Sequence, residues 1–239
     1  MTDIHESMTL GDLITAHPTL ARQLEQRGLD YCCGGARTLA TACEEIGLDA
    51  STVAGELADE ATDDEPPAWA LMGVVQLTEH LESTHHQYLW TELPRLAALV
   101  DKIVAVHGDR HPELLQVQRA FREIRADLEP HLMKEERVLF PLSRQLASSD
   151  TPPALPGGTL KNPISVMLSE HDRVGELLAE LRELTGGYEP PTDGCASYQA
   201  CYAGLAELEA DTHLHVHKEN NLLFPAVVQL EERLATATR

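Results

Sequence analysis

His131-Leu-Met-Lys-Glu135-Glu-Arg-Val-Leu-Phe140-Pro141 decides the fold, because the chain repeats it as His215-Val-His-Lys-Glu219-Asn-Asn-Leu-Leu-Phe224-Pro225. In each copy a histidine is followed four residues later by a glutamate, and an apolar run then ends in Phe-Pro. Residues four apart share one face of an α-helix, so each copy directs an imidazole and a carboxylate towards the same point. Two such helices facing each other predict a metal site lined by nitrogen and oxygen atoms.

The composition of the chain argues against several classes of function. Its 239 residues include 39 acidic and 18 basic side chains, which gives a formal charge of -21. Nucleic acids and anionic membranes attract the opposite sign of charge, so we expect neither as a partner. The N-terminus has no basic stretch followed by an apolar core, and no segment is apolar enough to span a bilayer. We therefore expect a cytoplasmic protein with reduced cysteines.

The apolar pattern is helical throughout and suggests two domains. Residues 1–60 predict a small domain of short helices, and the acidic, proline-bearing segment 61–68 has the composition of a linker. The remainder, residues 69–239, carries four long helical patterns, at about 69–106, 113–145, 164–184 and 198–234. No segment shows the two-residue alternation of a strand. The predicted fold is all-α, a four-helix bundle preceded by a small helical domain.

The two halves of the predicted bundle repeat each other, since His131 and His215 are 84 residues apart. The repeat predicts a further histidine on the helix that precedes each motif. His171 lies on an apolar stripe that faces the core. In the other half, the positions three, seven and ten residues after His86 are leucines, whereas those after His85 are polar or charged. Periodicity therefore favours His86 over His85.

The remaining histidines are sorted by the same criterion. His107 ends an apolar run directly before Gly108 and can turn inward. His213 and His217 flank His215 by two positions, which points them away from its face, so we expect them on the surface or behind the ligands. Several inward imidazoles and two facing carboxylates would be costly to bury without a cation. The predicted metal ligands are His86, His107, His131, Glu135, His171, His215 and Glu219.

The types of ligand narrow the choice of metal. No thiolate belongs to the set, so a structural zinc site fits poorly. Bridging carboxylates combined with several imidazoles suit a pair of octahedral iron or manganese ions. Of about twelve positions around two such ions, five imidazoles and two bridging carboxylates fill about nine, and an oxo or hydroxo bridge fills about two more. About one position would stay open to a small diatomic ligand.

Cys32 and Cys33 are adjacent and are followed by two glycines. Adjacent cysteines form only a strained disulfide, and the glycines leave both sulfurs approachable. We interpret them as a pair of redox or transfer thiols, the alternative being a loop of small buried residues. The other cysteines occupy patterns typical of structural residues, at Cys43, Cys195 and Cys201.

Five further motifs stand out in the chain: Tyr31 to Gly35, Met133 to Glu136, Pro163 to Met167, Glu170 to Asp172 and Glu219 to Pro225. On these motifs, residues 69–230 resemble the hemerythrin-like HHE cation-binding domain, and the N-terminal segment resembles the small domain that precedes it in the iron-sulfur cluster repair di-iron proteins. The resemblance implies a non-haem di-iron centre held by the seven predicted ligands, with the two glutamates bridging. It also implies repair of clusters damaged by nitric oxide or oxidants, with a role for the paired cysteines.

The implied partners are damaged iron-sulfur proteins and the small ligands nitric oxide and oxygen, and a homodimer is compatible with the sequence. One alternative function is a hemerythrin-like carrier or sensor of oxygen or nitric oxide. Another is an enzyme that reduces nitric oxide at the two irons. The Tyr-Cys-Cys-Gly-Gly segment favours repair, because a simple carrier has no need of it.

Overall fold

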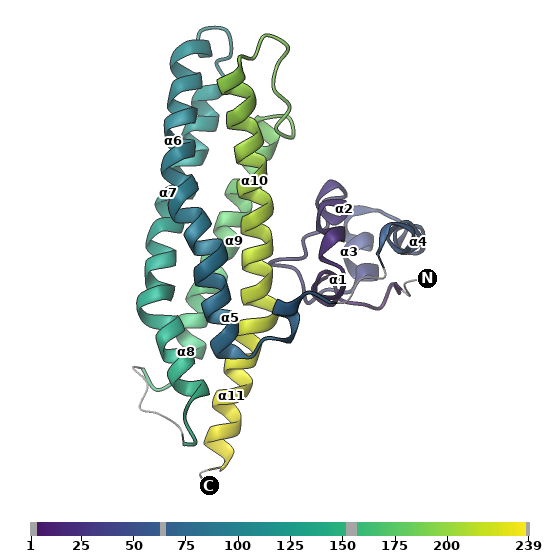
Figure 1. The fold of residues 1–239 in the computed structure, drawn as a ribbon. Coiled ribbons are helices and arrows are strands. Elements are labelled where there is room, and N and C mark those ends of the chain that lie inside the picture. The colour runs from purple at the N-terminus through teal and green to yellow at the C-terminus, as the bar shows by residue number, and fades with distance from the viewer. Residues whose placement is uncertain (1–3, 63–65, 152–156, 238–239) are drawn as a thin grey trace. The chain divides into compact units, whose positions relative to one another are not determined.

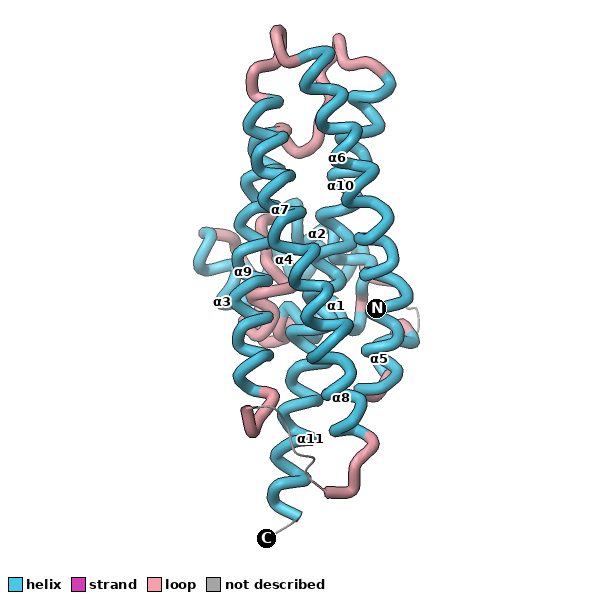
Figure 2. Tube along the Cα trace, turned by 90° about the vertical axis from the view of Figure 1, so that its left-hand side faces the viewer, coloured by secondary structure: helices cyan, strands magenta, loops and turns pink. Residues whose placement is uncertain are grey.

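The computed structural model of the chain is helical. It describes residues 4–62, 66–151 and 157–237. Within these residues Figure 2 shows helices and loops, and the only strand-like pairing there is an isolated bridge between Thr9 and Thr38. The prediction of an all-α fold is therefore confirmed. No described helix is both long enough and apolar enough to cross a membrane.

The chain forms two compact units, neither of which is a continuous stretch of sequence. The first combines Met1–Thr78 with Arg144–Ala154 and His213–Arg239, and the second combines Glu79–Ser143 with Leu155–Thr212. The division into 1–60, 61–68 and 69–239 stays a prediction, and residues 63–65 of its linker lie outside the described residues.

The second unit is built on four long helices, drawn in Figure 1. They are α6 (Gln87–His107), α7 (Leu114–Lys134), α9 (Lys161–Leu184) and α10 (Ala196–Lys218), of which α10 continues past residue 212 into the first unit. Helix α7 packs against both α6 and α9. Each helix contributes apolar side chains to one core, for example Leu93, Phe121, Leu178 and Leu205. The predicted four-helix bundle is confirmed, and Pro94 lies inside α6 without ending it.

Three π-helical turns interrupt the α-helices of the described residues. They are Glu82–His86 between α5 (Val74–Leu81) and α6, Glu135–Leu139 between α7 and α8 (Phe140–Ala147), and Glu219–Leu223 between α10 and α11 (Phe224–Ala237). The backbone N–H of Phe140 donates to the carbonyl of Glu135, and that of Phe224 donates to the carbonyl of Glu219. Each phenylalanine precedes a proline, which has no N–H to continue the α-helical ladder. The repeated Phe-Pro is thus the sequence signal of a π-turn, a feature that often accompanies functional sites.

The first unit contains four short N-terminal helices. They are α1 (Leu10–Ala16), α2 (Ala21–Gln26), α3 (Leu39–Ile46) and α4 (Ala50–Glu60). The side chains of Thr9, Thr38 and Asp49 accept backbone N–H groups at the starts of α1, α3 and α4, as expected of helix caps. The apolar core of these helices also contains Val216 of α10. The N-terminal helices therefore fold against the C-terminal end of the helix that carries the second His-x3-Glu motif.

Candidate metal centre

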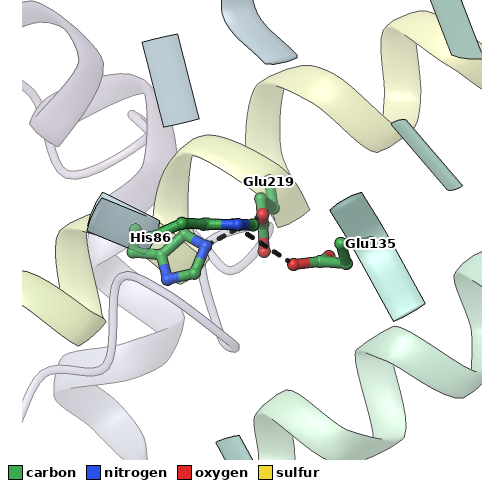
Figure 3. A group of neighbouring side chains, drawn as sticks. His86, Glu135 and Glu219 are labelled. Atoms are coloured by element: carbon green, nitrogen blue, oxygen red, sulfur yellow. Dashed lines mark hydrogen bonds and ion pairs between the residues drawn. The ribbon is translucent and has the colours of Figure 1, made fainter. Parts of the chain in front are cut away.

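Four of the predicted ligands lie together in the second unit. His131 is in the last turn of α7 and Glu135 begins the π-turn after it, with 3.2 Å between Nε2 of the imidazole and Oε2 of the carboxylate. His171 of α9 brings its Nε2 to 3.2 Å from that of His131. His86, which ends the first π-turn, places its Nε2 3.5 Å from the same Glu135 oxygen (Figure 3). All four side chains are buried.

A carboxylate behind each of two imidazoles fixes the position of its proton. Nδ1 of His131 donates to Glu170 across 2.9 Å, and this hydrogen bond lowers the pKa of the Glu170 carboxyl to about 2. Nδ1 of His86 donates to Glu136 across 3.1 Å, and the indole N–H of Trp90 donates to the same oxygen across 2.8 Å. Metal-binding histidines commonly have such an outer carboxylate, which orients the ring and leaves the other nitrogen for the metal.

Where the imidazoles of this cluster face Glu135, hydrogen-bond acceptors lie opposite one another with no donor between them. Because Nδ1 of His131 carries the proton, its Nε2 presents a lone pair to the Glu135 carboxylate when the ring is neutral. Neither Glu135 oxygen accepts a hydrogen bond from the described residues, although the side chain is 0 % exposed. A buried carboxylate without hydrogen bonds is costly. A proton would satisfy one of these contacts, whereas divalent cations would satisfy all of them, so the donor set fits metal ions.

The second copy of the motif reproduces the first. In the first unit, Nε2 of His215 lies 3.0 Å from Oε1 of Glu219, both side chains are buried, and Glu219 again begins a π-turn. Ligand atoms within 4.8 Å of one another among the described residues form two sets rich in histidine and glutamate. These sets are His86, Glu135, His215 and Glu219, and His131, Glu135, His171 and Glu219. Both glutamates belong to both sets, as bridging carboxylates would.

His107 does not lie with the other predicted ligands. It ends α6, 21 residues along the helix from His86, which corresponds to about 30 Å along the axis. Its Nδ1 accepts a hydrogen bond from Arg110, so its Nε2 carries the proton and donates to Cys195 Sγ across 3.2 Å. The prediction that His107 faces inward agrees with its burial. The prediction that His107 is a metal ligand needs correction. Apolar periodicity shows which face of a helix a residue lies on, but not how far along the helix axis it lies from the other ligands.

Two other histidines near the ligands have carboxylate partners. Nδ1 of His85 lies 2.8 Å from Asp211, and His85 belongs to neither histidine set, in line with the choice of His86. Nδ1 of His213 lies 3.0 Å from Glu25 of α2. These contacts give both histidines structural partners outside the candidate centre.

His217 is more deeply placed than its position in the motif suggested. It is 0 % exposed, between the ring of Tyr31 and the ring of Trp69, and it contacts Thr15 and Asn221 through its two nitrogens. Burial lowers the pKa of His217 to about 4. Of the two positions expected for His217, on the surface or behind the ligands, the surface position was wrong, because the N-terminal helices cover the side of α10 opposite to the motif.

Cys32 and Cys33 are reduced, with their sulfurs 3.9 Å apart, and Cys32 is the more buried. Their loop is fastened to the π-turn that comes after α10. The side-chain amide of Asn221 donates to the backbone carbonyls of Tyr31 and Cys32, and that of Asn220 also donates to Cys32. The sequence pointed to the two thiols but did not predict that Asn220 and Asn221 hold the loop. The only sign of this role in the sequence is that both asparagines directly follow Glu219.

Comparison with known proteins agrees with both parts of the chain. The hemerythrin HHE cation binding domain matches residues 77–227, and a domain of unknown function (DUF542) matches residues 6–61. A protein of Edwardsiella ictaluri (strain 93-146) named iron-sulfur cluster repair protein YtfE is 36% identical over 217 residues, 90% of this chain and 94% of the relative. The protein of the same name from Escherichia coli O81 (strain ED1a) is 32% identical over 221 residues, 92% of this chain and 96% of the relative. The chain therefore belongs to the hemerythrin HHE cation-binding family, in the group that includes these iron-sulfur cluster repair proteins.

Proposed function

We propose that this chain holds two non-haem iron ions in its buried histidine and glutamate centre and repairs iron-sulfur clusters damaged by nitric oxide or oxidants. The observation that carries the proposal is the pair of four-residue sets that share Glu135 and Glu219. The repair role is taken from the names of relatives that match at least 90% of the chain. The proposed clients are iron-sulfur proteins of the cytoplasm.

The donor set supports iron rather than a structural zinc ion. Each set offers two imidazoles and two carboxylates, and neither contains a thiolate. Without His107, four imidazoles and two bridging carboxylates fill about eight of about twelve positions around two octahedral ions. The centre thus has about one more open position than the sequence implied. Bound iron would supply a redox-active Lewis acid able to take small ligands such as nitric oxide.

The surrounding residues prepare this centre for a metal. Glu170 and Glu136 hold the Nδ1 protons of His131 and His86, so the Nε2 lone pairs are directed towards Glu135. Burial of these side chains keeps bulk water from competing for the same positions. These residues therefore orient ligands before any ion binds.

The cysteine loop favours repair over simple transport of a diatomic ligand. The relatives match the chain over the N-terminal segment as well as the bundle. Within the first unit, Asn220 and Asn221 connect the backbone of this loop to the π-turn that begins at Glu219. A carrier needs a ligand pocket but no thiol loop held beside a metal-ligand segment.

A matched pair of histidine variants tests the proposal. We expect about two irons per chain in the purified wild-type protein and in His107→Gln, and a loss of iron in His86→Gln. Wild type and His107→Gln should restore the activity of a hydratase whose iron-sulfur cluster has been damaged with nitric oxide, and His86→Gln should not. One zinc per chain, or equal repair by all three proteins, would overturn the proposal. If the reduced protein instead releases nitrous oxide when mixed with nitric oxide and restores no cluster, the function would be nitric oxide reduction rather than repair.

A further inference from the structure

The N-terminal loop brings together a second set of ligand atoms, outside the histidine and glutamate centre. A carboxylate oxygen of Asp30 and the sulfurs of Cys32 and Cys33 all lie within 4.8 Å of one another. Cys32 Sγ is 3.9 Å from Cys33 Sγ and 3.2 Å from Asp30 Oδ1. Soft sulfur donors make this set chemically distinct from the imidazole and carboxylate centre.

The separation of the sulfurs suits a shared metal ion. Two thiolates bound tetrahedrally at about 2.3 Å from one ion lie about 3.8 Å apart. The observed distance is 3.9 Å. A disulfide requires the sulfurs to approach to about 2.05 Å, which adjacent cysteines reach only with strain. The loop is therefore closer to a metal-chelating geometry than to an oxidised one.

The loop is organised before any ion arrives. Asp30 Oδ1 accepts the backbone N–H groups of Cys32 and Cys33, each across 3.0 Å, and Oδ2 accepts that of Gly34 across 2.8 Å. Asn221 holds the backbone of the same loop from the other side. A chelating loop that is already ordered loses less conformational entropy when the ion binds.

In the loop without metal, the thiol proton of Cys32 lies between its sulfur and Asp30 Oδ1, where a bound ion would lie. The thiol of Cys32 donates to Asp30 Oδ1. The hydrogen bond with Cys33, burial and the nearby Asp30 charge raise the pKa of the Cys32 thiol. Binding of a divalent ion would release the two thiol protons, with no transfer of electrons. Cys33 is partly exposed and Asp30 is exposed, so the set opens to solvent on one side.

We propose that Asp30, Cys32 and Cys33 form a second metal site, which takes a thiophilic divalent ion such as Fe²⁺ or Zn²⁺ through two thiolates and one carboxylate. Three ligands leave the fourth tetrahedral position open to water or to a thiolate of another protein. Because the fourth ligand position is open and faces solvent, the site suits transient binding and transfer of a metal ion rather than its storage. Its use to hand iron to a damaged client rests on the proposed function, whereas metal binding does not.

Cobalt provides a direct probe of this site. Reduced, metal-free full-length protein is titrated with Co²⁺, and thiolate-to-cobalt charge transfer is followed in the near ultraviolet. We expect this absorption in the wild type, with about two protons released per cobalt bound by thiolates. The absorption should be lost in Cys33→Ser and weakened in Asp30→Asn. Cys195→Ser is the matched control, because it removes an exposed thiol from the other unit and should leave the absorption unchanged.

The outcomes separate this site from the proposed function. No charge-transfer band in the wild type, or an equal band in Cys33→Ser, would overturn the second site even if two ions still bind elsewhere in the chain. We expect His86→Gln to lose the iron of the histidine and glutamate centre but to keep the thiolate-to-cobalt band, because the two sites use different residues. A protein that shows the band but repairs no cluster would retain the second site and refute the repair function. Helical circular dichroism of each variant identifies any loss of folding.

Discussion

The carboxylate behind His131 offers a sharp test of the metal centre. Glu170 Oε2 accepts from Nδ1 of His131 across 2.9 Å, and its side chain is 31% exposed. The change Glu170→Gln keeps the size and an acceptor oxygen but removes the negative charge behind the imidazole. The His131 ring then becomes a weaker base, and its Nε2 is held less firmly towards Glu135.

The size of the effect can be worked out from the role of outer carboxylates. Their loss typically lowers metal affinity by about 10- to 100-fold, which corresponds to about 1.4–2.7 kcal/mol. The loss should fall on one of the two proposed iron ions, because His131 belongs to only one of the two sets. We expect titration of the loaded protein with a chelator to become biphasic, with one iron removed at roughly 10- to 100-fold lower chelator concentration.

The control uses the same substitution elsewhere on α9. Glu176 is exposed and six residues beyond Glu170, so Glu176→Gln changes the charge of the protein equally. Its titration should match that of the wild type. If both variants behave alike, or if Glu170→Gln weakens both irons by the same factor, the assignment of Glu170 to the His131 set is refuted.

Three further changes test packing and thiol chemistry. A Cβ at Gly35 would lie 2.4 Å from the Asn221 side chain, so Gly35→Ala should lower the free energy of unfolding by about 1–3 kcal/mol. By contrast, Gly55→Ala on the open face of α4 should raise it by about 0.5–1 kcal/mol in the same denaturation assay. The hydrogen bond from His107 lowers the pKa of Cys195 to about 7, so alkylation of this thiol should rise with pH around a midpoint near 7. His107→Phe should move that midpoint upward towards 9, and an unchanged midpoint would contradict the contact.

Local geometry explains why much of the centre was predictable. The His-x3-Glu spacing needs only the pitch of one helix, and both copies bring the two side chains to within 3.2 Å in the structure. The choice of His86 over His85 also depended on one property, the rotation of residues about a helix axis. The fold class was predictable from the same periodicity.

The features that the sequence did not reveal depend on distances along helices and on neighbours from elsewhere in the chain. His107 faces inward as predicted, but it lies too far along α6 from His86 to reach the centre. His217 is buried because short helices from the N-terminus cover a second side of α10. Apolar periodicity assumes one buried face, so it could not anticipate this second contact.

The π-turns were also outside the reach of a 3.6-residue pattern. Each turn inserts a residue and rotates the next helix about its axis, so positions after Glu135 and Glu219 no longer continue the earlier stripe. Prolines at 141 and 225 were present as a signal, since a missing N–H inside a long helix requires some local rearrangement.

The position of helix α10 determines what happens when the N-terminal helices are removed from this protein. Its C-terminal end carries the candidate ligand His215, and the next residue, Val216, belongs to the core of the N-terminal helices. A chain shortened to begin after residue 62 would keep every histidine and glutamate of the centre. It would also expose the apolar side of α10 that those helices cover, together with the face of His217 that the ring of Tyr31 contacts. A bundle isolated in this way should self-associate through a surface that the intact protein does not display.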